Sequence, residues 1–103
     1  MYYTYMLRCT DGSIYTGMTN DIEKRLKAHI SGVGAKYTKS HKVEKIEIVW
    51  NSKTKSLACK LEYNLKQLSK LQKESLIIEK RLTKYLKGKV DCRRYKLFTK
   101  LNC

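Results

Sequence analysis

The chain has 103 residues, which fits one domain, because two separate cores would leave each half too small to bury enough apolar surface. Lysine and arginine number 23 against 9 aspartate and glutamate residues, giving a formal net charge of +14. Such an excess attracts polyanions and makes nucleic acid the first partner to consider. An acidic membrane surface would need a basic amphipathic helix with bulky aromatics on its apolar face, and the sequence contains none.

The apolar residues predict a packed core and no membrane span. They make up 42% of the chain, but no run approaches the roughly 20 residues that cross a bilayer, and no secretory leader pattern stands at the N-terminus. The four cysteines include no Cys-x-x-Cys pair and are too few for a disulfide scaffold, so we expect reduced thiols. We therefore expect a soluble, cytoplasmic protein.

A β-hairpin opens the chain. Residues 2–9 and 13–19 are rich in strand-forming Tyr, Thr, Ile and Leu, and residues 10–12 form the turn between them. A two-residue turn would put Tyr5 and Tyr15 on opposite faces, whereas a three-residue turn ending in a left-handed glycine leaves both on one face. We predict the three-residue turn.

A first helix is expected over residues 21–31, with Asn20 as its cap and Gly32 as its end. Its inward stripe is Ile22, Leu26 and Ile30. The following residues, 33–42, lose periodicity and form an exposed cationic loop.

The second half is expected to add a strand and two helices. Residues 45–50 alternate as a strand with one buried face, and residues 55–68 form a helix whose leucine stripe covers the sheet. A third helix is expected from a capping box at Ser69 to Gly88. Its predicted face is Leu71, Ser75, Ile78, Leu82 and Tyr85.

These elements define an α+β fold, in which a small antiparallel sheet, made of the hairpin and the third strand, is flanked by helices. We divide the chain into a domain over residues 1–88 and a basic C-terminal extension over residues 89–103. For the extension, a strand, a short helix and a flexible tail all remain open.

Few residues suit catalysis, since the chain has only two histidines and lacks a phosphate-binding glycine loop, a Ser-His-Asp pattern and clustered metal ligands. The hairpin holds four of the eight tyrosines, and Gly17 follows Tyr15 by two residues. A strand glycine often marks close approach of a ligand or another backbone. Composition alone nevertheless favours simple packing for strand tyrosines.

In combination, however, these residues resemble the GIY-YIG nuclease family. The match consists of Thr4-Tyr5, Tyr15-Thr16-Gly17, Arg25, His29 and Glu62, and it covers residues 2–78. The surrounding sequence is similar to that of the small stand-alone, single-domain bacterial members of this family. No single piece is specific, but their order and spacing together are.

Two departures from the family pattern occur. Tyr3-Thr4 stands where the first motif has Gly-Ile, and Thr16 stands where the second has Ile. Both substitutions occur in stand-alone members. A late asparagine of several relatives has no clear counterpart here, which leaves its supporting role unassigned.

The resemblance implies one active site, shared by the hairpin and the first two helices. It implies a divalent ion, Mg or Mn, on Glu62. It assigns Tyr5 as general base or water-positioning group, Tyr15 as its partner and a phosphate contact, and Arg25 as donor to the scissile phosphate. His29 would orient a tyrosine or polarise the water rather than bind metal. As a base, Tyr5 needs Arg25 or the ion to lower its usual pKa of about 10.

The predicted function is therefore metal-dependent endonuclease cleavage of phosphodiester bonds. DNA is favoured over RNA, and selectivity for a nucleic-acid structure is left open. The alternative is a non-catalytic, basic nucleic-acid-binding module with the same fold. The residues expected to contact nucleic acid in general are Lys36, Tyr37, Lys39, His41, Lys42, Arg93 and Arg94.

Overall fold

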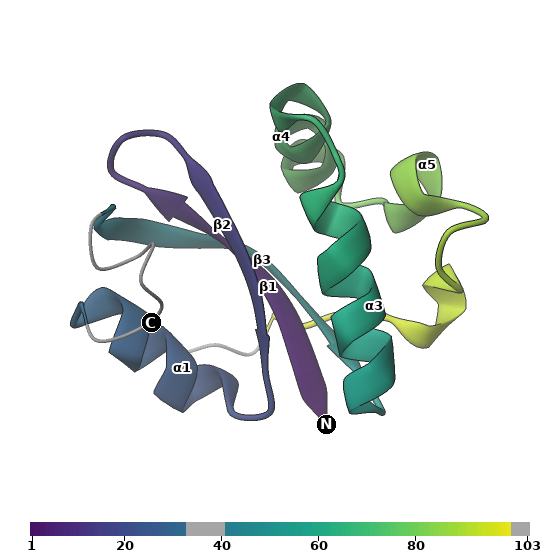
Figure 1. Cartoon of the computed structure of the whole chain (residues 1–103), viewed down its shortest axis with the longest axis horizontal. Coiled ribbons are helices and arrows are strands. Elements are labelled where there is room, and N and C mark those ends of the chain that lie inside the picture. Colours follow the sequence, from purple (N-terminus) through teal and green to yellow (C-terminus); the bar gives the residue numbers. More distant parts are fainter. Residues whose placement is uncertain (33–40, 100–103) are drawn as a thin grey trace.

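The strands of the protein form one antiparallel sheet, which helices flank (Figure 1). The computed structural model describes residues 1–32 and 41–99. The order is β1 (Tyr2–Cys9), β2 (Ile14–Thr19), α1 (Ile22–Ile30), β3 (Val43–Ser52), α3 (Lys55–Lys66), α4 (Lys70–Glu79), α5 (Leu82–Leu86), the 3-10 helix η1 (Cys92–Arg94) and β4 (Lys96–Leu97). The strands lie in the order β2-β1-β3-β4, so the predicted α+β class is confirmed and a fourth strand is added.

The hairpin turn has the predicted length of three residues. The Gly12 N–H donates to the Cys9 carbonyl at 2.9 Å, and the Cys9 N–H donates to the Ser13 carbonyl at 2.9 Å. Gly12 has a φ of 87°, the left-handed conformation that this turn requires. Tyr5 consequently lies opposite Gly17, and the predicted register is confirmed.

Helices cover both faces of the sheet, with α1 on one side and α3 and α4 on the other (Figure 1). The prediction that the third strand has one buried face is therefore wrong. Ile48 and Trp50 pack with the α3 side, whereas Val49 packs with α1. A shift in the pairing of β1 with β3 moves Ile46 to the α1 side as well, because a bulge reverses the alternation beyond it.

The first helix differs from expectation at both ends. Asp21 is its cap, since its carboxylate accepts from the Lys24 N–H at 3.1 Å, and Asn20 lies one residue outside. At the other end Ile30 is exposed, and His29 turns inward instead. The sequence placed His29 at the rim of the core, whereas the structure buries it.

The predicted third helix is two helices. Its capping box is confirmed, because Ser69 and Gln72 exchange both hydrogen bonds, but α4 ends at Glu79 where Lys80 adopts a φ of 59°. Leu71 and Ile78 are exposed, while the buried positions are Leu76 and Ile77. The apolar face of α4 therefore lies one residue away from the predicted stripe, whereas Leu82, at the start of α5, is buried as predicted.

The described part of the C-terminal segment packs onto the sheet. Residues of β4 pair with β3, and Tyr95 is buried and donates its hydroxyl proton to the Leu57 carbonyl at 2.6 Å. Strand and short helix, two of the three possibilities left open, both occur here. Within residues 1–32 and 41–99, no helix has the length and apolar character needed to cross a membrane.

Candidate active site

Three aromatic rings gather between the hairpin and α1. Tyr5 comes from β1, Tyr15 from β2 and His29 from α1, and we call them the ring cluster. Their ring centroids lie 6.3 Å (Tyr5–Tyr15), 5.6 Å (Tyr5–His29) and 5.2 Å (Tyr15–His29) apart. The hairpin register brings the tyrosines together, and the inward turn of α1 at its last residues adds the imidazole.

The Tyr5 hydroxyl sits between a base and a cation. Its oxygen lies 2.7 Å from His29 Nε2, and the Arg25 Nε–H donates to it at 3.4 Å. Burial, with the positive charge of Arg25, lowers the pKa of His29 to about 4, so its imidazole is neutral at pH 7. The phenol oxygen accepts from Arg25 and shares a second hydrogen bond with His29 Nε2, whose direction is set by the tautomer of the neutral imidazole.

This environment keeps the phenol protonated. Burial raises the pKa of Tyr5 to about 12, against the opposing hydrogen bond from Arg25. Arg25 does lower this pKa, as expected, but desolvation of the phenolate outweighs the nearby cation, so the net shift is upward. Tyr5 is positioned as a hydroxyl rather than as a ready base.

Gly17 provides the space that the Tyr5 hydroxyl occupies. A Cβ at this position would lie 2.7 Å from the Tyr5 hydroxyl oxygen and 3.0 Å from a ring carbon of Tyr15. Real Cβ atoms do not approach other atoms so closely, so a side chain here would displace one of the two rings. The glycine of the second motif thus has a steric reason within this site.

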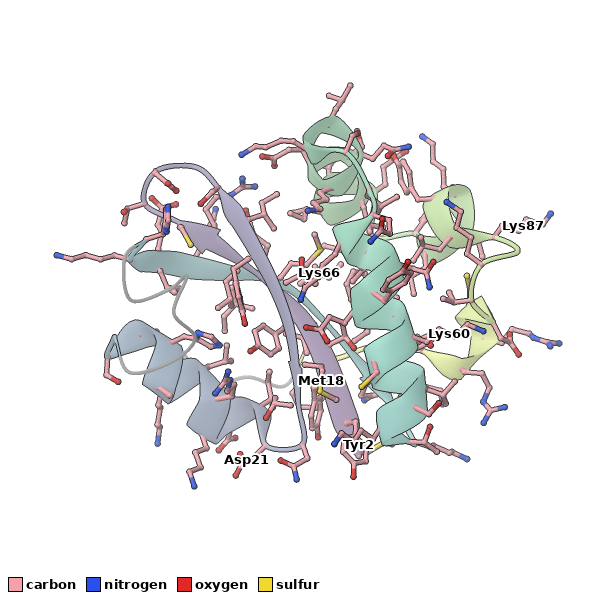
Figure 2. All side chains as sticks on the ribbon, in the orientation of Figure 1. Tyr2, Met18, Asp21, Lys60, Lys66 and Lys87 are labelled. Carbon is pink, nitrogen blue, oxygen red and sulfur yellow. The ribbon has the colours of Figure 1, made fainter. Side chains whose placement is uncertain are left out.

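Glu62 lies on α3 and contributes an acidic group beside the cluster. Its side chain is 22% exposed, and its carboxylate pairs with Lys66 Nζ at 3.1 Å. Its negative charge adds to the rise in the pKa of Tyr5. Lys66 extends from α3 towards the hairpin, whereas Lys60 lies on the opposite side of the helix (Figure 2).

The five predicted site residues differ in exposure. Tyr5 and His29 are 0% and 1% exposed, while Tyr15, Arg25 and Glu62 are half-buried. The surface at this site is therefore formed by the latter three, and Tyr5 and His29 support them from below.

A pocket of about 330 Å³ adjoins Arg25. It is lined by Tyr2, Met18, Thr19, Asn20, Arg25 and Lys55. In Figure 2, Tyr2 and Met18 lie where the hairpin approaches the start of α3. The sequence did not identify Tyr2 and Lys55 as residues of this site. Nothing marks them except that their segments meet at one end of the sheet.

Of the residues expected to contact nucleic acid, the four that the structure describes lie at opposite ends of the sheet. His41 Nε2 lies 3.7 Å from a carboxylate oxygen of Asp11 in the hairpin turn, and Lys42 is exposed next to it in the chain. Arg93 and Arg94 are exposed in η1, beside the other end of β3. Eight residues of β1 separate the two ends, about 25 Å at 3.3 Å per residue. Lys36, Tyr37 and Lys39 lie outside the described residues.

The family model described as the GIY-YIG catalytic domain matches residues 1–75, which contain all five predicted site residues. The chain belongs to the GIY-YIG family. This is a nuclease family whose members are generally dependent on divalent metal ions.

Relatives and a solved structure agree with this membership. A UPF0213 protein of Fusobacterium nucleatum is 57% identical over 76 residues, which cover 74% of this chain and 76% of the relative. A UPF0213 protein of Bacillus licheniformis is 49% identical over 80 residues, covering 78% and 82%. The solution NMR structure of a UPF0213 protein from Bacillus halodurans superposes with a TM-score of 0.52 at 43% identity, covering 78% of this chain and 86% of that one. The GIY-YIG fold is therefore shown by sequence and by structure.

Proposed function

We propose that the protein is a divalent-metal-dependent endonuclease that hydrolyses phosphodiester bonds, with DNA favoured over RNA. One observation carries the proposal: the Tyr5 hydroxyl is held between His29 and Arg25, beneath the half-buried ring of Tyr15. A merely structural tyrosine needs no such arrangement of acceptor and donor.

The exposed members of the site make the first contacts with substrate. Arg25 donates to the non-bridging oxygens of the scissile phosphate, where a guanidinium binds more strongly than a neutral donor. Tyr15 contributes a second contact to the same phosphate. Because Tyr5 keeps its proton, its oxygen positions the attacking water rather than removing a proton from it, and the hydrogen bond to His29 holds the hydroxyl in place.

Glu62 fits a divalent ion. It offers carboxylate oxygens, which magnesium and manganese prefer, and it is partly exposed. Lys66 already occupies this carboxylate as a cation and would have to leave it. In the described residues no three His, Cys, Asp or Glu side chains cluster as a metal site, so water and phosphate oxygens would complete the shell. When bound, the ion neutralises phosphoryl charge and lowers the pKa of its water.

We further propose that the protein acts in the cytoplasm and that its reaction site lies within residues 1–88. Cys9, Cys59 and Cys92 are free thiols, which suits a reducing compartment. A panel of substrates measures whether the protein selects branched or otherwise structured nucleic acid.

The test is a cleavage panel of labelled duplex, branched and single-stranded DNA and RNA, with Mg or Mn and with chelator. We expect cleavage only with the ion, loss of cleavage in Glu62→Ala, and binding largely retained, because removing a carboxylate relieves repulsion of the polyanion. Glu23→Ala, which removes an exposed acid from α1, is the matched control and should cut normally.

Two results would contradict this proposal. Full ion-dependent cutting by Glu62→Ala would remove its role as metal ligand. If the wild type bound the panel but cut nothing, the protein would instead be a non-catalytic nucleic-acid-binding module.

A further inference from the structure

A second pocket, of about 260 Å³, lies where β3 ends and η1 approaches it. Its lining includes Asn51, Ser52, Lys53, Arg93, Arg94 and Lys96. We call it the η1 pocket. Arg93, Arg94 and Lys96 lie beyond residues 1–75, which the family model matches, so the C-terminal segment adds this feature to the shared domain.

Ser52 is the unusual member of the η1 pocket. It is 2% exposed, and its hydroxyl oxygen has no hydrogen-bond partner among the residues that the structure describes. A buried hydroxyl without a partner is costly, and such groups are normally satisfied by protein, water or a ligand. Ser52 lines this cavity, so its buried hydroxyl is close enough to donate to an oxygen that binds there.

The charges around Ser52 specify the kind of oxygen. Arg93 is paired with Asp91 at 3.1 Å, whereas Lys53, Arg94 and Lys96 are exposed and form no ion pair with other described residues. Cations and one hydroxyl donor around a small cavity suit a phosphate group.

The η1 pocket is next to the pocket that contains Arg25. Tyr2 lines the Arg25 pocket, and its direct partner across the β1–β3 pair is Ser52. Side chains directly opposite in an antiparallel pair lie about 5 Å apart on the same face. Lys55, in the Arg25 pocket, and Lys53, in the η1 pocket, are two residues apart. Lys55 and Lys53 therefore form a row of cations between Arg25 and η1 at this end of the sheet.

We propose that the η1 pocket binds a backbone phosphate of the nucleic acid, away from the bond that is cut. This inference rests on the proposed function, since it assigns the path of the same substrate. The pocket holds the polymer by Ser52 and Arg94, and it directs one flank of the substrate towards the C-terminal segment rather than towards His41 and Lys42. The longest dimension of the protein, 36 Å, corresponds to roughly ten base pairs at 3.4 Å each.

The test measures binding by fluorescence anisotropy, in chelator so that no cleavage occurs, with a labelled duplex of 25 base pairs. Ser52→Ala should bind at least about tenfold more weakly, which corresponds to the loss of one hydrogen bond to a charged group. Its thermal midpoint should be unchanged or higher, because no internal hydrogen bond is lost. Arg94→Ala should weaken binding and reduce the salt slope by about 1. Lys87→Ala is the control, because it removes the same charge from a side chain that extends away from the sheet, beyond α5 (Figure 2).

The outcomes separate this inference from the proposed function. Wild-type affinity in a stable Ser52→Ala, or an Arg94→Ala that behaves like Lys87→Ala, would overturn the η1 pocket as a phosphate site even if the wild type cleaves DNA. Should Ser52→Ala prove unstable, the comparison of Arg94→Ala with Lys87→Ala decides alone. If the wild type never cleaves but both pocket variants lose binding, the η1 pocket stands and the nuclease proposal fails.

Discussion

Burial keeps both Tyr5 and His29 in their neutral forms. The phenol is hydrogen-bonded to Nε2 of an imidazole whose pKa burial has lowered to about 4, while burial raises the pKa of the phenol to about 12. Proton transfer from Tyr5 to His29 is therefore strongly unfavourable in the protein without substrate. The pair orients a hydroxyl, and any gain in basicity must come from charge that arrives with the substrate or the ion.

The low pKa of His29 predicts a loss of stability in mild acid. The unfolded chain takes up this proton near pH 6.5 and the folded protein only near pH 4, so the free energy of unfolding falls as the pH drops through that window. We expect a loss of about 3 kcal/mol from this group. Denaturant unfolding of the wild type and of His29→Gln between pH 4 and 7 measures it. The variant should show a flatter profile, and equal profiles would contradict the burial of a neutral imidazole.

Gly17 allows a second test at the residue scale. Gly17→Ala forces a methyl group against the Tyr5 hydroxyl and the Tyr15 ring, so we expect about 2–3 kcal/mol of destabilisation and a loss of cleavage. The control is Gly12→Ala, whose Cβ meets no atom within 4 Å but whose φ of 87° costs about 1 kcal/mol. Gly12→Ala should keep cleavage, and a Gly17→Ala that cuts normally would show that the rings need not be held in this arrangement.

At the residue scale, the sequence predicted which side chains lie together, but it did not predict the direction of their pKa shifts. Turn chemistry at Gly12 is local, so the common face of Tyr5 and Tyr15 followed from the residues themselves. The burial of His29, and with it the raised pKa of Tyr5, depends on how α1 packs against the sheet. That depth is a tertiary property, and the family pattern does not state it.

An ion-pair cluster joins the hairpin, β3 and α4. The Arg8 guanidinium bonds to both carboxylate oxygens of Glu74, at 2.6 and 2.5 Å, and its Nε–H donates to Glu47 at 2.8 Å. The Arg8 side chain is only 15% exposed. Removing the cation would leave two partly buried carboxylates facing each other, which is more costly than losing a surface pair.

We therefore expect Arg8→Met to cost about 2–3 kcal/mol. A change of 1 kcal/mol moves the thermal midpoint of a small domain by roughly 4–8 °C, so a midpoint lower by about 10 °C or more is expected. Lys84→Met, which breaks the exposed pair with Glu79, is the control and should shift the midpoint little. Equal shifts for the two variants would mean that the Arg8 cluster is no more than a surface ion pair.

Among the elements, type was easier to predict than orientation. The capping box at Ser69 correctly started α4, because it is a local hydrogen-bond pattern. The end of α4 at Lys80 carries no glycine or proline to announce it, so the sequence predicted one continuous helix. The bulge between β1 and β3 likewise moved Ile46 to the other face without a residue-type signal.

Over the whole molecule, the described cations that we expect to contact nucleic acid lie in two regions, and the site lies between them. His41 and Lys42 lie by the hairpin turn, while Arg94 and Lys53 lie at the opposite end of β3. The composition predicted a polyanionic partner. It did not predict this division, because a net charge of +14 does not specify where the cations lie in the fold. A substrate that reaches the ring cluster from the η1 side uses the cations that extend from Arg25.

The central claim is that the ring cluster acts in phosphodiester hydrolysis, and single-turnover cleavage by Tyr5→Phe tests it most directly. This change removes only the hydroxyl that lies between His29 and Arg25. Tyr3→Phe removes a hydroxyl two residues earlier on the same face of β1 and is the matched control. With saturating Mg, we predict a rate about 10²- to 10³-fold lower for Tyr5→Phe, with unchanged DNA affinity, and a normal rate for Tyr3→Phe. Cleavage by a folded Tyr5→Phe at the wild-type rate would contradict the account.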